Sequence, residues 1–304
     1  MTFETKSEVL DWYESQERAL TDEFIGDIPW HKVKDYPLDE RLVPVLLYMR
    51  DIEILTDMYH EELKRTPTGK DSVISKFMER WGIEEITHGE LINRFLNEAG
   101  IETPDNWKEK INLDVSGVYN FYTRILTALT NCVGESFTAT HMAYGAINEL
   151  SAAQAYRRLI EIADHPVLTH ILKGIIREES VHTQFYYSVA RLELKKSKYS
   201  QSIARFIVKN FWRPVGSGAR PDASRNYAIA MLFGDEEGVE WINRTVTERV
   251  QKLPGFDGIT KVTDKIAEIG INTRTKLQTK LAKQALNLFV IFNAVFYFNR
   301  DFIF

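Results

Sequence analysis

Helical periodicity runs through most of this chain and limits what it can fold into. Apolar residues recur three and four positions apart over about Leu42–Lys64, Ser72–Ala99, Val115–Ile162 and Val167–Lys196. Residues at that spacing share one face of an α-helix. We find no convincing alternating strand pattern and no glycine-rich phosphate loop. The sequence therefore predicts an all-α protein with long helices.

Each of the four apolar stripes is interrupted by ionisable side chains. The first and third stripes each carry a lone glutamate, and the second and fourth each carry a Glu-x-x-His pair. The repeated order suggests a weak internal duplication. The predicted inward-facing groups are Glu53, Glu85, His88, Glu135, Glu179 and His182.

Such a set needs compensating charge. An isolated carboxylate buried in an apolar core is very costly, and two imidazoles cannot balance four carboxylates. Two divalent metal ions would balance them, and carboxylate oxygens with one imidazole per ion suit iron or manganese better than structural zinc. Lone glutamates alternating with Glu-x-x-His pairs on four helices are the pattern by which bundle cores hold such ions. The sequence therefore predicts a carboxylate-bridged pair of metal ions in a helical bundle.

Proline and glycine breaks separate the helices, but none reads as a flexible linker between domains. We therefore expect a single domain over residues 1–304. Residues 1–41 would form an N-terminal helix and connection, 42–196 a four-helix bundle core, and 197–304 a helical C-terminal extension.

Three segments carry a resemblance to a known family. "WGIEEITHGELINRFL" is similar to a Trp-x-x-Glu-Glu-x-x-His-Gly-Asp-Leu-x-Asn segment, with Glu90 in the Asp position. "ESFTATH" is similar to a Glu-x-x-Thr helix, and "REESVHTQFYY" to an acidic-Glu-x-x-His helix with a tyrosine four residues later. These segments resemble the soluble acyl-acyl-carrier-protein desaturases of the ferritin-like di-iron superfamily. The resemblance covers about Trp30 to Lys196, although the segment between Glu135 and Glu179 is longer than in typical members.

The resemblance implies a ferritin-like bundle in which the six groups bind two iron ions, with Glu85 and Glu179 as bridges. It implies that Thr138, three residues after Glu135, helps to deliver protons. Glu178 matches an acid that holds a ligand histidine from outside the cluster, and Glu84 stands at the equivalent place before Glu85. Trp30 resembles a tryptophan that relays electrons, and a core aromatic is the alternative.

The activity implied by the resemblance is O₂-dependent introduction of a cis double bond into a fatty acyl chain. The chain would be carried on acyl carrier protein, the electrons would come from a ferredoxin-type donor, and the enzyme would be a homodimer. Because the carrier is acidic, a basic docking patch is needed. The best candidate patch contains Arg191, Lys195, Lys196, Lys198, Arg205, Lys209, Arg213 and Arg220.

Other di-iron proteins provide the alternatives. Ile92 stands where a ribonucleotide reductase small subunit would have its radical tyrosine, and ferritins have chains about half this length. An N-oxygenating or aldehyde-deformylating enzyme remains open, because the ligands barely differ. A non-catalytic homologue that binds acyl carriers would be expected to have lost a ligand.

The composition of the chain limits its expected partners and cellular location. The net charge of -5 argues against a nucleic-acid partner. The single cysteine, Cys132, allows no internal disulfide, so we expect a reducing bacterial cytoplasm. The first 24 residues read as an amphipathic helix rather than a targeting signal. The aromatic tail Leu286–Phe304 is interrupted by polar residues, which favours packing on the body or a partner over contact with a membrane.

Overall fold

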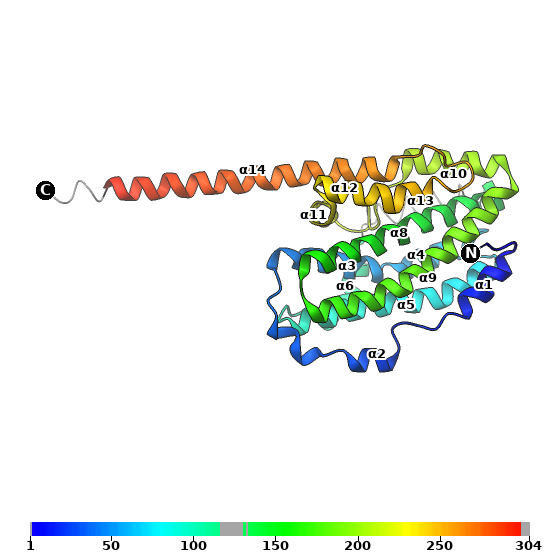
Figure 1. The fold of residues 1–304 in the computed structure, drawn as a ribbon, viewed down its shortest axis with the longest axis horizontal. Coiled ribbons are helices and arrows are strands. Elements are labelled where there is room, and N and C mark those ends of the chain that lie inside the picture. The colour runs from blue at the N-terminus through cyan, green and yellow to red at the C-terminus, as the bar shows by residue number, and fades with distance from the viewer. Residues whose placement is uncertain (1, 116–129, 132, 299–304) are drawn as a thin grey trace.

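The computed structural model describes residues 2–115, 130–131 and 133–298, with side chains described as far as Lys280. The part of the chain described is helical and contains no β-strand, which confirms the all-α prediction (Figure 1). The α-helices are α1 (Lys6–Glu14), α2 (Asp22–Asp27), α3 (Val43–Ile54), α4 (Thr56–Leu63), α5 (Ser72–Glu98), α6 (Trp107–Leu113), α8 (Thr138–Ala163), α9 (Pro166–Lys196), α10 (Lys198–Phe211), α11 (Asp222–Phe233), α12 (Glu236–Ile242), α13 (Glu248–Val250) and α14 (Lys261–Phe298). Short helical turns occur at η1 (Trp30–Asp35), η2 (Glu40–Leu42), η3 (Gly134–Phe137) and η4 (Asn243–Thr247), the last with π-helical hydrogen bonds.

Helices α3, α5, α8 and α9 form the centre of the molecule (Figure 1). Helix α8 packs along α9, and α3 packs along α5, while α5 and α9 also touch each other. The stripes predicted for these helices face inward: Leu46 on α3, Ile92 on α5 and Leu172 on α9 are fully buried. One continuous apolar core therefore surrounds the middle of these helices.

Local sequence signals explain where the two longest core helices start. Asp71 caps α5, since its carboxylate accepts hydrogen bonds from the backbone N–H groups of Val73 and Ile74. At the start of α9 the His165 ring accepts from the Leu168 N–H, and Pro166 occupies the first turn, where no N–H is needed. The predicted ranges for these two helices match the structure to within one residue.

Other boundaries differ from the prediction. The helix expected over Leu42–Lys64 is divided at Leu55 into α3 and α4. The N-terminal region is not one amphipathic helix: α1 ends at Glu14, and an irregular segment precedes α2. Helix α8 covers the second half of the stretch predicted over Val115–Ile162, while the first half lies largely outside the described residues.

The C-terminal region packs helices α10–α14 along one side of this centre. Helix α14 lies against α11 and then continues beyond the other helices (Figure 1). The backbone from Leu286 to Phe298 is helical, but the predicted packing of this tail concerns side chains outside the described part. In the residues that could be searched, no helix combines the length and apolar character needed to cross a bilayer.

Two glycines allow the core helices to approach closely. A β-carbon added at Gly145 on α8 would overlap the ring of Tyr186 on α9. A β-carbon at Gly89 on α5 would come within 2.8 Å of Ile54 Cδ1 on α3. Since protein interiors are close-packed, these contacts fix the spacing of both helix pairs.

We predict opposite effects for two glycine-to-alanine substitutions. Gly145→Ala should destabilise the protein by about 1–3 kcal/mol, because the new methyl group overpacks the α8–α9 contact. Gly82→Ala is the matched control on α5: its nearest neighbour would be His60 Nδ1 at an ordinary 3.6 Å. There, alanine should stabilise the helix by roughly 0.5–1 kcal/mol. Urea unfolding measures both effects, and equal stability of the two variants would contradict the close approach.

Candidate metal centre

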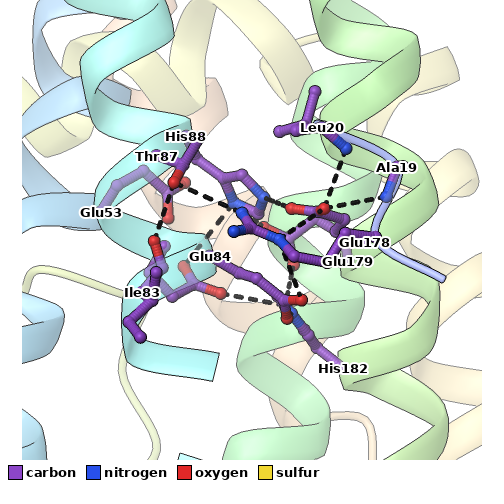
Figure 2. Close-up of polar contacts among 12 residues, drawn as sticks. Ala19, Leu20, Glu53, Ile83, Glu84, Thr87, His88, Glu178, Glu179 and His182 are labelled. Atoms are coloured by element: carbon purple, nitrogen blue, oxygen red, sulfur yellow. Dashed lines mark hydrogen bonds and ion pairs between the residues drawn. The ribbon is translucent and has the colours of Figure 1, made fainter. Parts of the chain in front are cut away.

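A cluster of buried ionisable side chains lies where the four central helices meet. Each is at most 7% exposed, although polar residues of these types are rarely buried. Figure 2 shows Glu53, His88, Glu179 and His182 converging from three of the helices. The six inner groups are Glu53 on α3, Glu85 and His88 on α5, Glu149 on α8, and Glu179 and His182 on α9.

These six residues form two overlapping sets of donor atoms. One set contains Glu53, Glu85, His88 and Glu179, and the other contains Glu85, Glu149, Glu179 and His182. In each set the donor atoms lie within 4.8 Å of one another. Each set could hold a metal ion through three carboxylates and one imidazole, and Glu85 and Glu179 belong to both.

Two further carboxylates hold the histidines from outside. His88 Nε2 lies 3.1 Å from Glu178 Oε2, and His182 Nε2 lies 2.8 Å from Glu84 Oε2 (Figure 2). The pairing is crosswise, because each acid comes from the helix opposite its histidine. A carboxylate at Nε2 favours a proton on that nitrogen and turns Nδ1 toward the inner acids. Glu178 therefore occupies the place predicted for it, and Glu84 has the equivalent place on α5.

The inner donor atoms are positioned for a ligand that the protein itself does not supply. Within the described residues, Glu85 Oε1, both Glu179 oxygens and Nδ1 of His88 and His182 are buried and make no hydrogen bond, although His182 Nδ1 lies 3.0 Å from Glu85 Oε1 and His88 Nδ1 lies 3.4 Å from Glu179 Oε1. Buried polar atoms are normally satisfied, so orphans gathered at one point need an explanation. Hard oxygen donors with an inward imidazole nitrogen fit divalent transition-metal ions.

Burial and mutual repulsion shift the titration of the inner carboxylates. Burial, reinforced by the negative charge of Glu179, raises the pKa of Glu85 and Glu149 well above the ordinary value. Burial also raises the pKa of Glu53. For Glu179 burial acts the same way, but the contacts with His182 and His88 outweigh it and lower the pKa. Without metal, ionising all four buried carboxylates at once has a large free-energy cost.

The histidines and outer acids behave as ion pairs in the metal-free protein. Burial opposes the charge on His182, but Glu179 and Glu84 outweigh it and raise its pKa to about 10. The pKa of His88 is likewise raised, against burial, by Glu178 and Glu179. Burial works against ionisation of Glu84, yet His182 and Arg80 lower its pKa to about 2. Protons therefore compete with metal for both histidines.

The structure places Glu149 in the cluster, and not the predicted Glu135. Glu135 lies exposed on η3 and does not belong to either donor set, whereas Glu149 is 7% exposed on α8 and belongs to one. Two sequence signals indicated this. The predicted third stripe, extended three positions past Ala146, reaches Glu149. Glu53 precedes Glu85 by 32 positions and Glu149 precedes Glu179 by 30, whereas Glu135 precedes Glu179 by 44.

Thr138 is not close to the cluster either. It starts α8, eleven residues before Glu149, which at about 1.5 Å per residue separates the two by about 16 Å along the helix. Its hydroxyl lies 3.2 Å from that of Thr68, which in turn contacts His141 Nδ1 at 2.7 Å. The residue three positions after Glu149 is Ala152, which has no hydroxyl. The structure therefore gives Thr138 a place in a separate buried hydrogen-bond group.

Tyr156 also contributes to the cluster, although none of the predicted motifs contains it. Tyr156 is fully buried on α8, seven residues after Glu149, and its hydroxyl donates to Glu53 Oε1. The heptad spacing places it on the face that carries Glu149, which is the signal that could have found it. By occupying one oxygen of Glu53, Tyr156 leaves the other oxygen for the cluster.

The predicted relay and docking residues lie away from the cluster. Trp30 packs under the Arg94 guanidinium, and its Nε1 donates to the Ile25 carbonyl. No described contact joins Trp30 to Glu178. Of the predicted basic patch, Arg220 pairs with Asp51 and Arg205 donates to backbone carbonyls. The exposed members near α10 are Lys195, Lys196, Lys198, Lys209 and Arg213.

Comparisons of this chain with protein-family models, with curated proteins and with solved structures found no match. The functional argument therefore depends on the geometry of the cluster and on the residues that surround it.

We predict that metal content distinguishes Glu149 from Glu135. Glu149→Gln should reduce binding from two ions per chain toward one, because Glu149 belongs to only one donor set. Glu135→Gln, at an exposed position on η3, is the matched control and should still bind two. Elemental analysis of metal-loaded, desalted protein measures this. Loss of an ion from the Glu135 variant alone would restore the original prediction.

We also predict that metal binding releases protons. The pKa of His182 is about 10 and that of His88 is raised, so both rings are protonated at neutral pH and must lose a proton before Nδ1 can bind metal. Apparent affinity should therefore rise with pH from neutral pH up to about 10, where His182 loses its proton. Calorimetric titration with Mn²⁺ in two buffers of different ionisation enthalpy measures the release. Equal heats in both buffers would contradict it.

The raised pKa of His182 also determines how the stability of the metal-free protein changes with pH. Because the folded pKa of His182 lies above the ordinary value of 6.5, its ion pairs stabilise the metal-free protein fully below pH 6.5. This contribution is lost as the pH rises through about 10.

Proposed function

We propose that this protein binds two iron ions at the inner cluster and is an O₂-dependent oxidase. The observation that carries the proposal is the pair of overlapping donor sets, which share Glu85 and Glu179 and leave both Nδ1 atoms unsatisfied. Four carboxylates balance the charge of two divalent ions, which removes the main cost of burying them. Oxygen-rich sets with one imidazole each favour iron or manganese.

The proposal includes a ferritin-like arrangement of α3, α5, α8 and α9. It is supported by the order of the donors along the chain: a lone glutamate on α3, Glu-x-x-His on α5, a lone glutamate on α8 and Glu-x-x-His on α9. This is the order by which di-iron carboxylate sites are built in bundle cores.

The substrate class that we propose is a fatty acyl chain carried on acyl carrier protein. Support comes from the resemblance of Trp81–Leu96 and Arg177–Tyr187 to the acyl-carrier-protein desaturases. The third resembling segment, around Glu135 and Thr138, does not lie at the cluster, so the proposal depends on α5 and α9. Desaturation would convert two neighbouring methylenes, O₂, two electrons and two protons into a cis double bond and two water molecules.

Iron, when bound, would supply the redox chemistry that side chains cannot perform. The residues of this chain would hold the ions and orient the histidine rings that bind them. Glu84 and Glu178 accept from Nε2–H of the histidines and thereby keep each Nδ1 directed inward. Aromatic rings close one side: Phe77 stacks on Phe185 at 3.8 Å, and Tyr186 packs edge-on to Phe77 at 5.1 Å. This packing keeps water away from the donors.

The exposed basic residues near α10 support an acidic partner such as acyl carrier protein. Lys195, Lys209 and Arg213 are exposed, and the neighbouring Phe206 and Phe211 are each 58% exposed. Aromatic and basic side chains on one surface are typical of protein contacts. An electron donor of the ferredoxin type is part of the same proposal.

A second candidate function is another di-iron oxidation, such as N-oxygenation or aldehyde deformylation. The specific observation in its favour is Ala152, which stands three positions after Glu149 where the desaturase pattern has threonine.

The test is product analysis with iron-loaded protein. We expect wild-type protein, given O₂, reduced ferredoxin and acyl carriers of several chain lengths, to remove two hydrogens from the acyl chain, as seen by mass spectrometry. Glu149→Gln is the inactive control, and Lys209→Glu should weaken turnover by raising the KM for the acyl carrier. Oxygen consumption with unchanged acyl chains would favour the second candidate. Failure of the wild type to bind iron would contradict both.

A further inference from the structure

The segment between α1 and α2 crosses the outer face of α5 and α9 and reaches the acids that hold the histidines. Figure 2 shows Ala19 and Leu20 directed at Glu178. Their backbone N–H groups each donate to Glu178 Oε1 at 3.0 Å. These N–H groups are available because the chain is irregular here.

This segment and the end of α1 also hold the second acid, Glu84. Tyr13, at the end of α1, donates from its hydroxyl to Glu84 Oε2 at 2.9 Å. Arg18 Nε lies 3.5 Å from Glu84 Oε1 and 3.5 Å from Glu178 Oε1. Among the ion pairs of the described residues, those of Arg18 are the ones that reach both outer acids.

Apolar packing fixes the ends of this segment. Tyr13 is 1% exposed and packs edge-on against Phe77 at 4.8 Å. Leu20 is 2% exposed and lies against α9 at Gly174, where a β-carbon would meet the leucine side chain at 2.5 Å. The segment is therefore held at both ends by the core that encloses the metal centre.

Charge balance explains why the outer acids need these donors. Each acid holds its histidine through Nε2–H, and both acids are almost fully buried, so their oxygen atoms need donors from the protein. Arg80 Nε donates to Glu84 Oε1 at 2.7 Å, and Arg18 adds a second positive charge between the two acids. Two arginines thus balance two carboxylates, just as two divalent ions would balance the four inner carboxylates.

We propose that the segment Tyr13–Leu20 is part of the metal centre and that Arg18 is a positioning residue for both ligand histidines. This inference rests on the proposed metal centre. Loss of the Arg18 charge leaves Glu84 and Glu178 facing each other without their shared cation. Repulsion then moves the two acids apart, each histidine loses its fixed orientation, and both donor sets bind metal more weakly.

The position of Arg18 makes the inference testable. Its side chain is 33% exposed and lines a surface pocket of about 250 Å³ together with Arg80 and Arg177. A substitution there removes a charge without opening a cavity in the core. Arg177 is exposed in the same pocket and makes no described ion pair with Glu84 or Glu178, so it provides a matched control.

The experiment compares full-length wild type, Arg18→Gln, Arg18→Lys and Arg177→Gln. Metal affinity is measured by competition of Mn²⁺ with a coloured chelator, and the unfolding midpoint of each metal-free protein is measured in urea. We expect Arg18→Gln to bind both ions roughly 10–100-fold more weakly. Arg18→Lys should recover most of that loss, and Arg177→Gln should match wild type.

The outcomes separate the two proposals. If wild type binds no metal, the proposed function fails. If wild type binds two ions and Arg18→Gln binds them equally well, only the role of Arg18 is overturned. A third outcome would also overturn the role of Arg18. In that outcome Arg18→Gln loses metal affinity, its metal-free form unfolds at a lower urea concentration than wild type, and Arg18→Lys recovers neither property. Arg18 would then act by stabilising the fold.

Discussion

The burial of four carboxylates at one point is the constraint on which the rest of this structure depends. Glu53, Glu85, Glu149 and Glu179 lie in an apolar interior, where ionised groups are costly unless a cation meets them. Nearby histidines offset part of this cost only by taking up protons, which also blocks their inward nitrogen atoms. The arrangement is therefore unfavourable as a purely structural core, and divalent metal ions are the simplest compensation.

Two layers of charge follow from this constraint. The inner layer supplies oxygen and nitrogen donors, and the outer layer, Glu84 and Glu178, holds the histidines crosswise. The outer layer is completed by residues far away in the sequence, because the segment before α2 brings Arg18 and two backbone N–H groups to it. The N-terminal region thus contributes to the site although it contains none of the inner donors.

Much of the fold could be predicted, because helical spacing alone identifies which face of a long helix is buried. The stripes on α5 and α9 were predicted with both Glu-x-x-His pairs, and these four residues are buried. Glu149 could not be chosen over Glu135 with the same ease, because in the continuous helix that the sequence predicts the two residues are about four turns apart and would share one face. A short family-like motif around Glu135 outweighed the better spacing of Glu149.

The sequence by itself determined the helices, their buried faces and the excess of acidic groups on those faces, because these properties depend on local spacing and composition. Only the tertiary structure decided whether Glu135 or Glu149 reaches the cluster, because that depends on how α8 packs against α9, where Gly145 closely contacts Tyr186. It also decided that Tyr156 meets Glu53 and that Arg18 meets both outer acids. Contacts between residues so far apart in the chain leave no periodic signal, so packing alone brings them together.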